Sequence, residues 1–185
     1  MVPIAQLHKD YSLITDKSGN SIYSQGWFGK FTKSNHLKLD PFETVLLLER
    51  KKIEVVETDS EELPVSKVVA FFSENIRNFL IHYLLYKDLR GRGYVVKKHS
   101  INGKYFELYE RGATPKKAKH LALVVPMIEG VLFNIDDIDQ IVSEAKKLNK
   151  QLIFAVIDSL GDVSYYSVSE LEFEEVNKNI GEENK

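Results

Sequence analysis

Apolar residues change their spacing midway along the chain. Over residues 66–89 they recur at every third or fourth position, which predicts a helix of about 24 residues that ends at the Gly-Arg-Gly of 91–93. Beyond it apolar and polar residues alternate, which predicts strands over 93–99 and 104–109 joined by a tight turn at Asn102 and Gly103. The predicted inward positions of the helix are Val69, Phe72, Ile76, Phe79, Leu80 and Tyr83.

The rest of the C-terminal half predicts a third strand, a helix and a final strand pair. The third strand, HLALVVPM at 120–127, is the most apolar, and the last two are QLIFAVID at 151–158 and DVSYYSV at 162–168. The order helix–β–β–β–α–β–β favours a mixed sheet flanked by helices. The helix over 134–150 is amphipathic, and the residues predicted to face inward are Ile135, Ile138, Ile141, Val142, Ala145 and Leu148.

The first forty residues are polar and rich in turn signals, so we expect short strands and loops there. A helix then begins in LDPFETVLLLERKK, where Asp40 is the N-cap, Pro41 the first helical residue and Glu43 completes a capping box. A short strand, IEVVETD, follows at 53–59. The apolar anchors expected before the helix are Ile22, Tyr23, Trp27 and Phe28.

A polar segment, SEELPVS at 60–66, is the best boundary between domains, and its Pro64 ends any preceding helix. The pattern therefore predicts an α/β (α+β) protein with a small N-terminal α/β domain at 1–62. A C-terminal domain built on the mixed sheet is expected at 65–176, and the acidic tail at 177–185 is expected to be flexible.

Composition restricts the possible chemistry of the protein more than it restricts the possible folds. The 185 residues include no cysteine, which excludes disulfides, thiolate nucleophiles and cysteine-ligated zinc, and fits a reducing cytosol. The start of the chain lacks the apolar core of a signal peptide, and the longest apolar runs are too short to span a bilayer. We therefore expect a cytoplasmic protein without a membrane partner.

Basic residues are concentrated in one segment, although the formal net charge is only −2. Between Tyr86 and Lys119 there are ten Lys and Arg residues and three acidic residues. Two interpretations are open. The segment is either a solvated face balanced by its neighbours or a patch that faces phosphate groups.

The sequence contains no P-loop, no GxGxxG after a strand, no HExxH and no GxSxG. Its histidines are scattered, which does not favour a metal site, so we predict none. Catalysis without metal or cysteine needs proton-transfer groups and a cation, and the basic half offers Tyr, His and Lys. These types suit an RNA phosphodiester whose own 2′-hydroxyl attacks the phosphorus.

Several stretches, in order, resemble the archaeal tRNA-splicing (tRNA-intron) endonuclease family. The quoted stretches are YSQGWFGK, LDPFETVLLLERKKIEVV, YLLYKDLRGRGYVVKK, YFELYERGA and KKLNKQLIFAVIDSLGDVSYYSV, and YKDLRxRGY is the most specific element. The resemblance covers about residues 10 to 170. It implies an N-terminal α/β domain, a C-terminal nuclease-type domain, precursor tRNA as partner, and cleavage without metal or cofactor.

The resemblance also implies a catalytic Tyr, His and Lys. The Tyr of the family's strand maps to Tyr109, the Lys before QLIFAVID maps to Lys150, and His120 is the histidine within reach of the expected position. Tyr109 would assist removal of the 2′-hydroxyl proton, His120 would protonate the 5′-oxygen, and Lys150 would stabilise the charged phosphorane. The products would carry 2′,3′-cyclic phosphate and 5′-hydroxyl ends. Because the reference pKa of tyrosine is about 10, we expect nearby cations such as Lys150 to lower it.

The chain departs from the family pattern at several positions. Tyr105 stands where an Asp is usual, Leu121 follows the His where a small residue is usual, and Asn149 replaces an Arg. Counting back from Pro126 would put Lys117 in place of the His. A non-catalytic structural or RNA-positioning subunit of the same complex therefore remains an alternative.

The resemblance turns the basic segment into a predicted RNA-binding surface. A helix that ends in Arg-Gly-Arg-Gly, followed by cationic strands, would place positive charge beside RNA phosphates. In the alternative, Arg90 pairs internally with Asp88 or Glu107 and fixes the helix on the sheet. The predicted RNA contacts are Arg90, Arg92, Lys97, Lys98, Arg111 and the lysines of 116–119, including Lys117.

The end of the chain suggests an oligomer. The strand VSYYSV is short, aromatic and a plausible sheet edge, and the resemblance assigns subunit contacts to it and to the acidic loop before it. We expect a homodimer or α4 tetramer, or an α2β2 heterotetramer with a paralogous subunit. The predicted interface residues are Asp158, Asp162, Tyr165 and Tyr166.

Two other functional classes compete with a metal-independent nuclease. A non-enzymatic RNA-binding or scaffold protein would bind RNA and its partners without cutting. A metal-dependent nuclease would need a carboxylate pair beside a lysine on adjacent strands, and KYFELYE supplies only Glu107 and Glu110.

Overall fold

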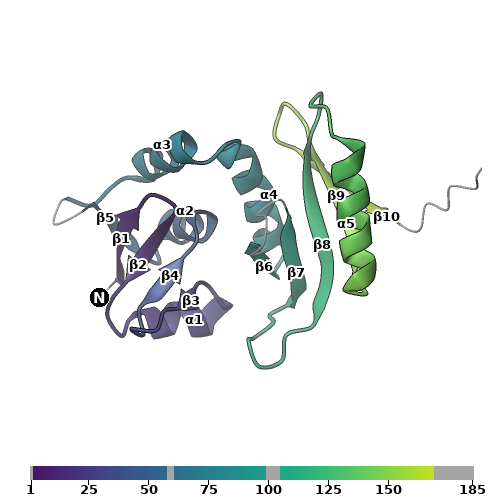
Figure 1. Ribbon diagram of the computed structural model, residues 1–185. Helices are drawn as coiled ribbons and strands as arrows, with labels where there is room; N and C mark the ends of the chain where they lie inside the picture. The colour runs from purple at the N-terminus through teal and green to yellow at the C-terminus, as the bar shows by residue number, and fades with distance from the viewer. Residues whose placement is uncertain (1, 58–60, 99–104, 169–185) are drawn as a thin grey trace, which may run out of the picture.

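The computed structural model describes residues 2–57, 61–98 and 105–168 and contains two five-stranded sheets, as Figure 1 shows. The N-terminal sheet has the order β3-β4-β2-β1-β5, and only its β1–β5 pair is parallel. Its strands are β1 (Ile4–His8), β2 (Tyr11–Ile14), β3 (Lys30–Phe31), β4 (Leu37–Leu39) and β5 (Glu54–Val56).

The C-terminal sheet has the order β10-β9-β8-β7-β6, and only β8 and β9 are parallel. The predicted mixed sheet is confirmed. The described residues do not include 99–104, so the predicted hairpin turn at Asn102 and Gly103 lies outside them. The strands are β6 (Tyr94–Lys98), β7 (Phe106–Arg111), β8 (His120–Ile128), β9 (Gln151–Ile157) and β10 (Val163–Val168).

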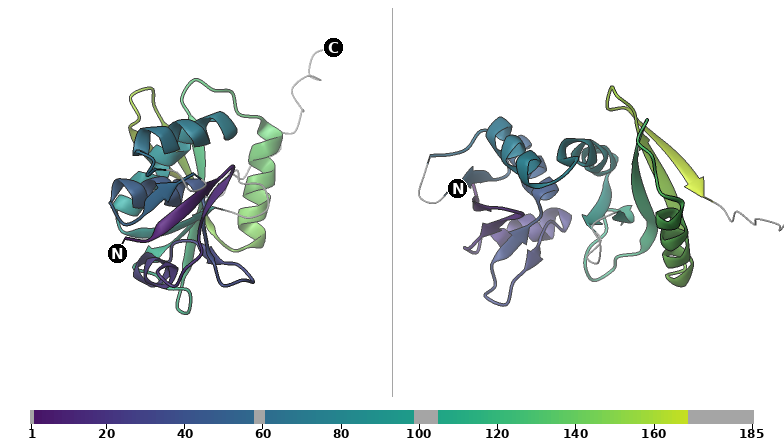
Figure 2. Two further views of the ribbon diagram at one scale, coloured as in Figure 1. Left: turned by 90° about the vertical axis from the view of Figure 1, so that its left-hand side faces the viewer. Right: turned by 45° about the horizontal axis from the view of Figure 1, so that its top comes forward.

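Helices cover both sheets. In Figure 1 and in the right-hand view of Figure 2, α4 lies between the two sheets and α5 covers the face of the C-terminal sheet that points away from the N-terminal half. The helices are α1 (Gly19–Gly26), α2 (Pro41–Glu49), α3 (Val65–Asn75), α4 (Phe79–Gly91) and α5 (Ile135–Lys147).

The start of α2 is formed as predicted. The Asp40 carboxylate accepts a hydrogen bond from the Glu43 N–H at 2.8 Å, and the Glu43 carboxylate accepts one from the Asp40 N–H at 3.0 Å. Pro41 occupies the first turn, where its missing N–H costs nothing. The helix is buried from Pro41 to Leu48, because it runs between the N-terminal sheet and the elements of the second half.

The main hydrophobic core is continuous across the two halves. Phe42 of α2 stacks on Phe79 of α4 and meets Phe106 of β7, with ring centroids 5.2 and 5.5 Å apart. A smaller core on the outer face of the C-terminal sheet includes Leu123 and Ile141, between β8, β9 and α5. The two sheets are thus separate, but burial of apolar surface couples them.

The predicted helix over 66–89 and two of the predicted inward positions need correction. The single helix predicted over 66–89 is two helices, because the chain leaves the helical path at Ile76 and takes a left-handed conformation at Asn78 (φ 56°). Asparagine tolerates this conformation better than most residues. Both helices contribute to the same core, so the apolar spacing continues across the break. Leu80 and Leu148, predicted to face inward, are 50% and 43% exposed.

The helix α1 lies in a region where only strands and loops were expected. Its sequence, GNSIYSQG, is poor in strong helix formers, and Ile22 is its buried apolar anchor. Gly19 packs so closely that a Cβ there would approach the Cβ of Leu37 to 2.9 Å. Tertiary packing therefore explains a helix that local propensity does not favour.

Candidate active site

Three strands bring Tyr109, His120 and Lys150 together, and we call these residues the strand-end site. Because β7 and β8 are antiparallel, the last part of β7 lies beside the first part of β8, and Tyr109 is the partner of His120 in the register. Because β8 and β9 are parallel, Lys150, directly before β9, reaches the same end of the sheet.

Contacts between these residues are direct. The rings of Tyr109 and His120 stack with centroids 5.0 Å apart and an interplanar angle of 27°. The Lys150 Nζ donates a hydrogen bond to the His120 carbonyl oxygen at 3.2 Å. The register of β7 and β8 shifts between Leu108 and Tyr109, and such bulges often re-aim a side chain at functional sites.

The protonation of Tyr109 differs from our expectation. Burial, together with a hydrogen bond to Glu107 and the negative charge of Glu107, raises the pKa of Tyr109 well above its ordinary value. The Tyr109 hydroxyl donates to the Glu107 carboxylate at 2.7 Å. The expected lowering of the Tyr109 pKa by Lys150 is therefore wrong for this chain, where the hydroxyl is hydrogen-bonded to a carboxylate.

His120 Nε2 lies 3.1 Å from the Ala122 carbonyl oxygen. A carbonyl oxygen can only accept, so Nε2 carries the proton of this hydrogen bond. Lys117, the alternative for the histidine position, is exposed in the connection before β8. The contact with Tyr109 favours His120 over Lys117.

Sequence reasoning missed two neighbours of Tyr109. Glu107 was considered only as a partner of Arg90 or as half of a carboxylate pair. Trp27 was considered only as an apolar anchor, but its ring lies 4.9 Å from that of Tyr109. The aromatic stretch YSQGWFGK was the available signal, yet nothing local in it indicates a residue 82 positions further along the chain.

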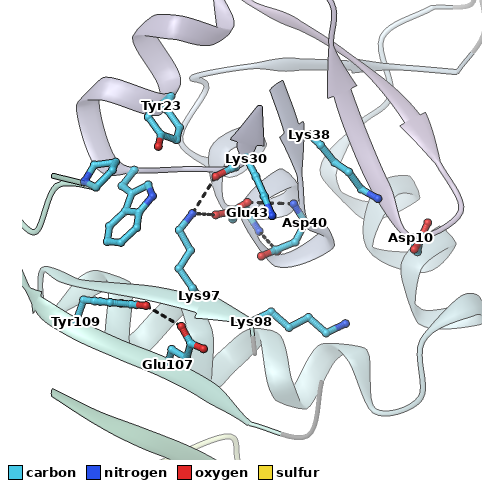
Figure 3. Close-up of a pocket in the computed structure, with 13 residues that line it drawn as sticks. Asp10, Tyr23, Lys30, Lys38, Asp40, Glu43, Lys97, Lys98, Glu107 and Tyr109 are labelled. Carbon is cyan, nitrogen blue, oxygen red and sulfur yellow. Dashed lines mark hydrogen bonds and ion pairs between the residues drawn. The ribbon is translucent and has the colours of Figure 1, made fainter. Parts of the chain in front are cut away.

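A cleft of about 650 Å³ borders Tyr109, and we call it the interdomain cleft (Figure 3). Glu107 and Tyr109 lie along one side of it, and Lys30, Lys38 and Asp10 lie across from them. Its lining comes from both halves of the chain: Asp10, Tyr23, Trp27, Gly29, Lys30, Lys38, Asp40, Glu43, Lys97, Lys98, Glu107, Tyr109 and Pro115.

Two of the predicted RNA contacts are engaged inside the protein. Lys97 Nζ forms an ion pair with Glu43 at 2.8 Å and donates to the Gly29 carbonyl oxygen at 3.3 Å. The two side chains of the ion pair are 17% and 3% exposed. Lys97 therefore joins β6 to α2, as Figure 3 shows.

Arg90 has an internal role of the same kind. It is 9% exposed, donates to the Gly26 carbonyl oxygen at 2.9 Å and packs over the Phe28 ring at 3.9 Å. The internal alternative is thus favoured over RNA contact, with Gly26 as the partner instead of the expected Asp88 or Glu107. We call the Arg90–Gly26 and Lys97–Glu43 contacts the seam between the two halves.

The remaining predicted RNA contacts are exposed. Arg92 forms an ion pair with Asp88 at 2.7 Å, and Arg111 lies over the Tyr94 ring at 5.1 Å. Lys98 and Lys117 have no ion pair recorded within the described part of the chain. These four residues can meet a polyanion without first leaving a buried site.

Of the four predicted interface residues, two make contacts within the chain and two face solvent. Asp158 shapes the turn between β9 and β10, since its carboxylate accepts from the N–H groups of Leu160 and Asp162 at 2.8 and 2.9 Å. The Tyr165 hydroxyl donates to the Asp88 carboxylate at 2.5 Å, which fixes β10 to α4. Asp162 faces solvent, as do Leu160 and Tyr166, which are 87% and 59% exposed.

The described ranges contain no group of three or more His, Cys, Asp or Glu residues placed to hold a metal ion. They also contain no helix long and apolar enough to cross a membrane. Tyr105 is buried within the smaller core.

Comparison with known proteins matches both halves of the chain. A family model for the tRNA intron endonuclease N-terminal domain matches residues 4–69, and one for the tRNA intron endonuclease catalytic C-terminal domain matches residues 79–165. Relatives include a tRNA-splicing endonuclease of Thermococcus onnurineus, 34% identical over 85% of this chain and 90% of that protein. Another, of Thermococcus gammatolerans, is 35% identical over 90% of this chain and 97% of that protein. The chain therefore belongs to the tRNA intron endonuclease family of tRNA-splicing enzymes.

Proposed function

We propose that this chain is a catalytic subunit of a tRNA-splicing endonuclease that cuts precursor tRNA at both intron–exon junctions within a bulge–helix–bulge. The observation that carries the proposal is the meeting of Tyr109, His120 and Lys150 at one end of three adjacent strands. Cleavage is transesterification. The 2′-oxygen attacks the adjacent phosphorus, the bond to the 5′-oxygen breaks, and the products carry 2′,3′-cyclic phosphate and 5′-hydroxyl ends.

The raised pKa of Tyr109 shapes the proton path. A neutral phenol accepts a proton only if it gives up its own, and the Tyr109 hydroxyl already donates to Glu107. The 2′-hydroxyl proton moves to the Tyr109 oxygen while the Tyr109 proton moves to the Glu107 carboxylate. Glu107 thus acts through Tyr109 as a positioning residue and final proton acceptor.

The other two residues act on the phosphate. His120 acts as the imidazolium: its Nε2–H stays hydrogen-bonded to the Ala122 carbonyl and its Nδ1 proton goes to the leaving 5′-oxygen, while the Lys150 ammonium stabilises the negative charge of the phosphorane. In the free protein the Lys150 Nζ is held beside the backbone of His120 by its hydrogen bond to the His120 carbonyl. No metal or cofactor takes part in these steps.

Precursor tRNA binds through the exposed part of the basic segment in this proposal. The phosphates contact the exposed residues Arg92, Lys98, Arg111 and Lys117, whereas Arg90 and Lys97 hold the two halves together.

The proposed domain limits are 1–62 and 65–176, and the proposed location is the cytoplasm. The tail at 177–185 lies outside the described residues.

The proposed assembly is a dimer or tetramer, α4 or α2β2, formed around the β10 edge. The outward positions of Asp162, Leu160 and Tyr166 support it, since an exposed apolar group beside an unpaired strand edge is a site for a partner chain. We expect light scattering to give at least twice the 21.2 kDa chain mass at micromolar concentration. If the measured mass is that of one chain both for the chain alone and in the presence of any co-purifying paralogue, the proposed assembly is wrong.

The alternative is a non-catalytic subunit that positions RNA in the same complex. The raised Tyr109 pKa favours it, as do Tyr105 and Asn149 at positions where the family has other residues. The two roles predict different outcomes for the purified chain, assayed alone and with any co-purifying paralogue on a bulge–helix–bulge RNA in EDTA. A catalytic chain yields cyclic phosphate ends, whereas a chain that binds this RNA without cutting it has the positioning role.

A further inference from the structure

The interdomain cleft has a chemistry of its own next to the strand-end site. It lies between strands β3 and β4 of one sheet and β6 and β7 of the other (Figure 3). Its volume of about 650 Å³ lies within the range of about 300–1,000 Å³ typical of small-ligand sites. It shares Tyr109 with the strand-end site, so a group bound in it touches the residue proposed to meet the 2′-hydroxyl.

Aromatic rings connect the cleft to the strand-end site. The Tyr109 ring lies between those of Trp27 and His120, at centroid distances of 4.9 and 5.0 Å. Tyr23 also lines the cleft. Tyr23 and Trp27 thus bring aromatic rings to the cleft, and such rings stack with nucleobases whatever their sequence.

The backbone of Trp27 is strained. Its φ of 51° lies in the left-handed region that large side chains rarely adopt. Its N–H donates to the Tyr23 carbonyl oxygen at 2.8 Å and closes the end of α1, so the surroundings hold the strained form in place. Such strain is often found where a side chain must be presented in a fixed position for function.

The acidic residues of the cleft are mostly engaged, whereas Lys30 and Lys98 are exposed and Lys38 Nζ lies 3.9 Å from the centroid of the Tyr11 ring. Glu43 pairs with Lys97, Asp40 caps α2, and Glu107 accepts from Tyr109. Asp10 also lines the cleft. In the described ranges no ion pair is recorded for the remaining lysines of the cleft, Lys30, Lys38 and Lys98.

We infer that the interdomain cleft binds one unpaired nucleotide of the RNA next to the cleavage position. Its base stacks on Trp27, and its phosphates face Lys30 and Lys98. The nucleotide must be unpaired, because a base inside a duplex has no free face for a side-chain ring. This inference rests on the proposed function and deepens it, since it gives the N-terminal half a direct part in substrate recognition.

The test uses Trp27 as its own reporter, because it is the only tryptophan in the chain. A bulge–helix–bulge RNA is titrated into the purified full chain, with any co-purifying paralogue, while intrinsic fluorescence is recorded. The titration is repeated with RNAs in which each unpaired nucleotide near the cleavage position is abasic in turn. We expect quenching with the intact RNA, and one abasic position that abolishes it and weakens binding about tenfold.

Variants locate the contact. Trp27→Leu should bind the intact RNA about tenfold more weakly and should be insensitive to that abasic position, because the stacking partner is already absent. A double variant, Lys30→Ala with Lys98→Ala, should lose affinity. Lys67→Ala, on the exposed face of α3, should not, and serves as the matched control.

The outcomes separate the inference from the proposed function. If the RNA is bound and cut but no abasic position changes the fluorescence, the inference is wrong and the proposed function stands. If the RNA is neither bound nor cut, both are wrong. The abasic series uses the unaltered protein, so it decides the question even if Trp27→Leu fails to fold.

Discussion

The seam and the strand-end site use the same kinds of side chain in opposite ways. At the seam, Arg90 and Lys97 of the second half each meet an acceptor from the first half, a carbonyl or a carboxylate, and they are largely buried. At the strand-end site, Tyr109, His120 and Lys150 are half-buried, and Tyr109 borders the interdomain cleft. The basic side chains of the seam and the residues of the strand-end site come from the same basic half of the chain. Whether the first half lies against a side chain therefore separates the structural cations from the candidate catalytic groups.

The largest effect should come from breaking the seam at Lys97. Lys97→Met leaves the Glu43 carboxylate, 3% exposed, without its ion-pair partner, and loss of one member of a buried pair typically costs about 3–5 kcal/mol. We expect the free energy of unfolding, measured by urea denaturation, to fall by about this amount.

The control for this variant replaces both partners. Lys97→Met combined with Glu43→Gln removes the stranded charge and should recover most of the loss. Equal instability of the single and double variants would show that the pair does not hold the halves together.

The proton path through Tyr109 should give the next effect. Tyr109→Phe should slow single-turnover cleavage by about 100-fold, and Glu107→Gln should slow it similarly, because general acid–base groups typically contribute ~10²–10⁴-fold. Since Glu107 acts through Tyr109, the double variant should be no slower than Tyr109→Phe alone. Multiplying effects in the double variant would contradict a shared path.

The N-terminal cap of α2 should show a dependence on pH. Burial, followed by the charge of Glu43, raises the pKa of Asp40 to about 7, against the opposing influence of Lys97 and Lys98. Because the folded-state pKa lies above the ordinary value of 3.8, stability should fall as pH rises from about 4 to 7, by at most ~1.4 kcal/mol per pH unit.

Asp40→Asn tests this dependence, because asparagine is also a good N-cap but does not ionise. Urea denaturation at pH 5, 6, 7 and 8 should show a shallower decline for the variant than for the parent. Parallel curves would mean that Asp40 does not titrate in this window.

The smallest effect should come from the exposed cations. Lys117→Ala should weaken RNA binding only a few-fold and reduce the slope of log K against log salt by about 0.7–0.9, as expected for one lost phosphate contact. Arg111→Ala should behave in the same way. If the slope is unchanged in both variants, the exposed part of the segment does not face phosphate.

The order of elements in the C-terminal half could be predicted because its signals are local. The alternation of apolar residues in β6 and β7, the apolar run of β8, the amphipathic α5 and the capping box of α2 each depend on residues that are close together in the sequence. The break at Asn78 was invisible to this reasoning, since the apolar spacing continues through it. Helix α1 was missed because packing, not propensity, stabilises it.

The candidate site likewise has a part that could be predicted from the sequence and a part that could not. Tyr109, His120 and Lys150 could be assigned from the resemblance, and strand pairing brings them together. The contact of Trp27 with Tyr109 and the pairing of Lys97 with Glu43 join residues far apart in the sequence. Charge and residue type alone could not tell that Lys97 is half-buried and Lys98 exposed, although they are neighbours.

The central claim is that the strand-end site carries the chemistry, and single-turnover cleavage of a bulge–helix–bulge RNA in EDTA tests it most directly. His120→Ala should cleave at least ~100-fold more slowly than the parent with nearly unchanged RNA affinity, while Lys117→Ala, at the position that competed for the same role, should keep the parent rate at saturating RNA. If His120→Ala cuts as fast as the parent in the same assembly, the catalytic assignment is wrong and this chain positions RNA for another subunit.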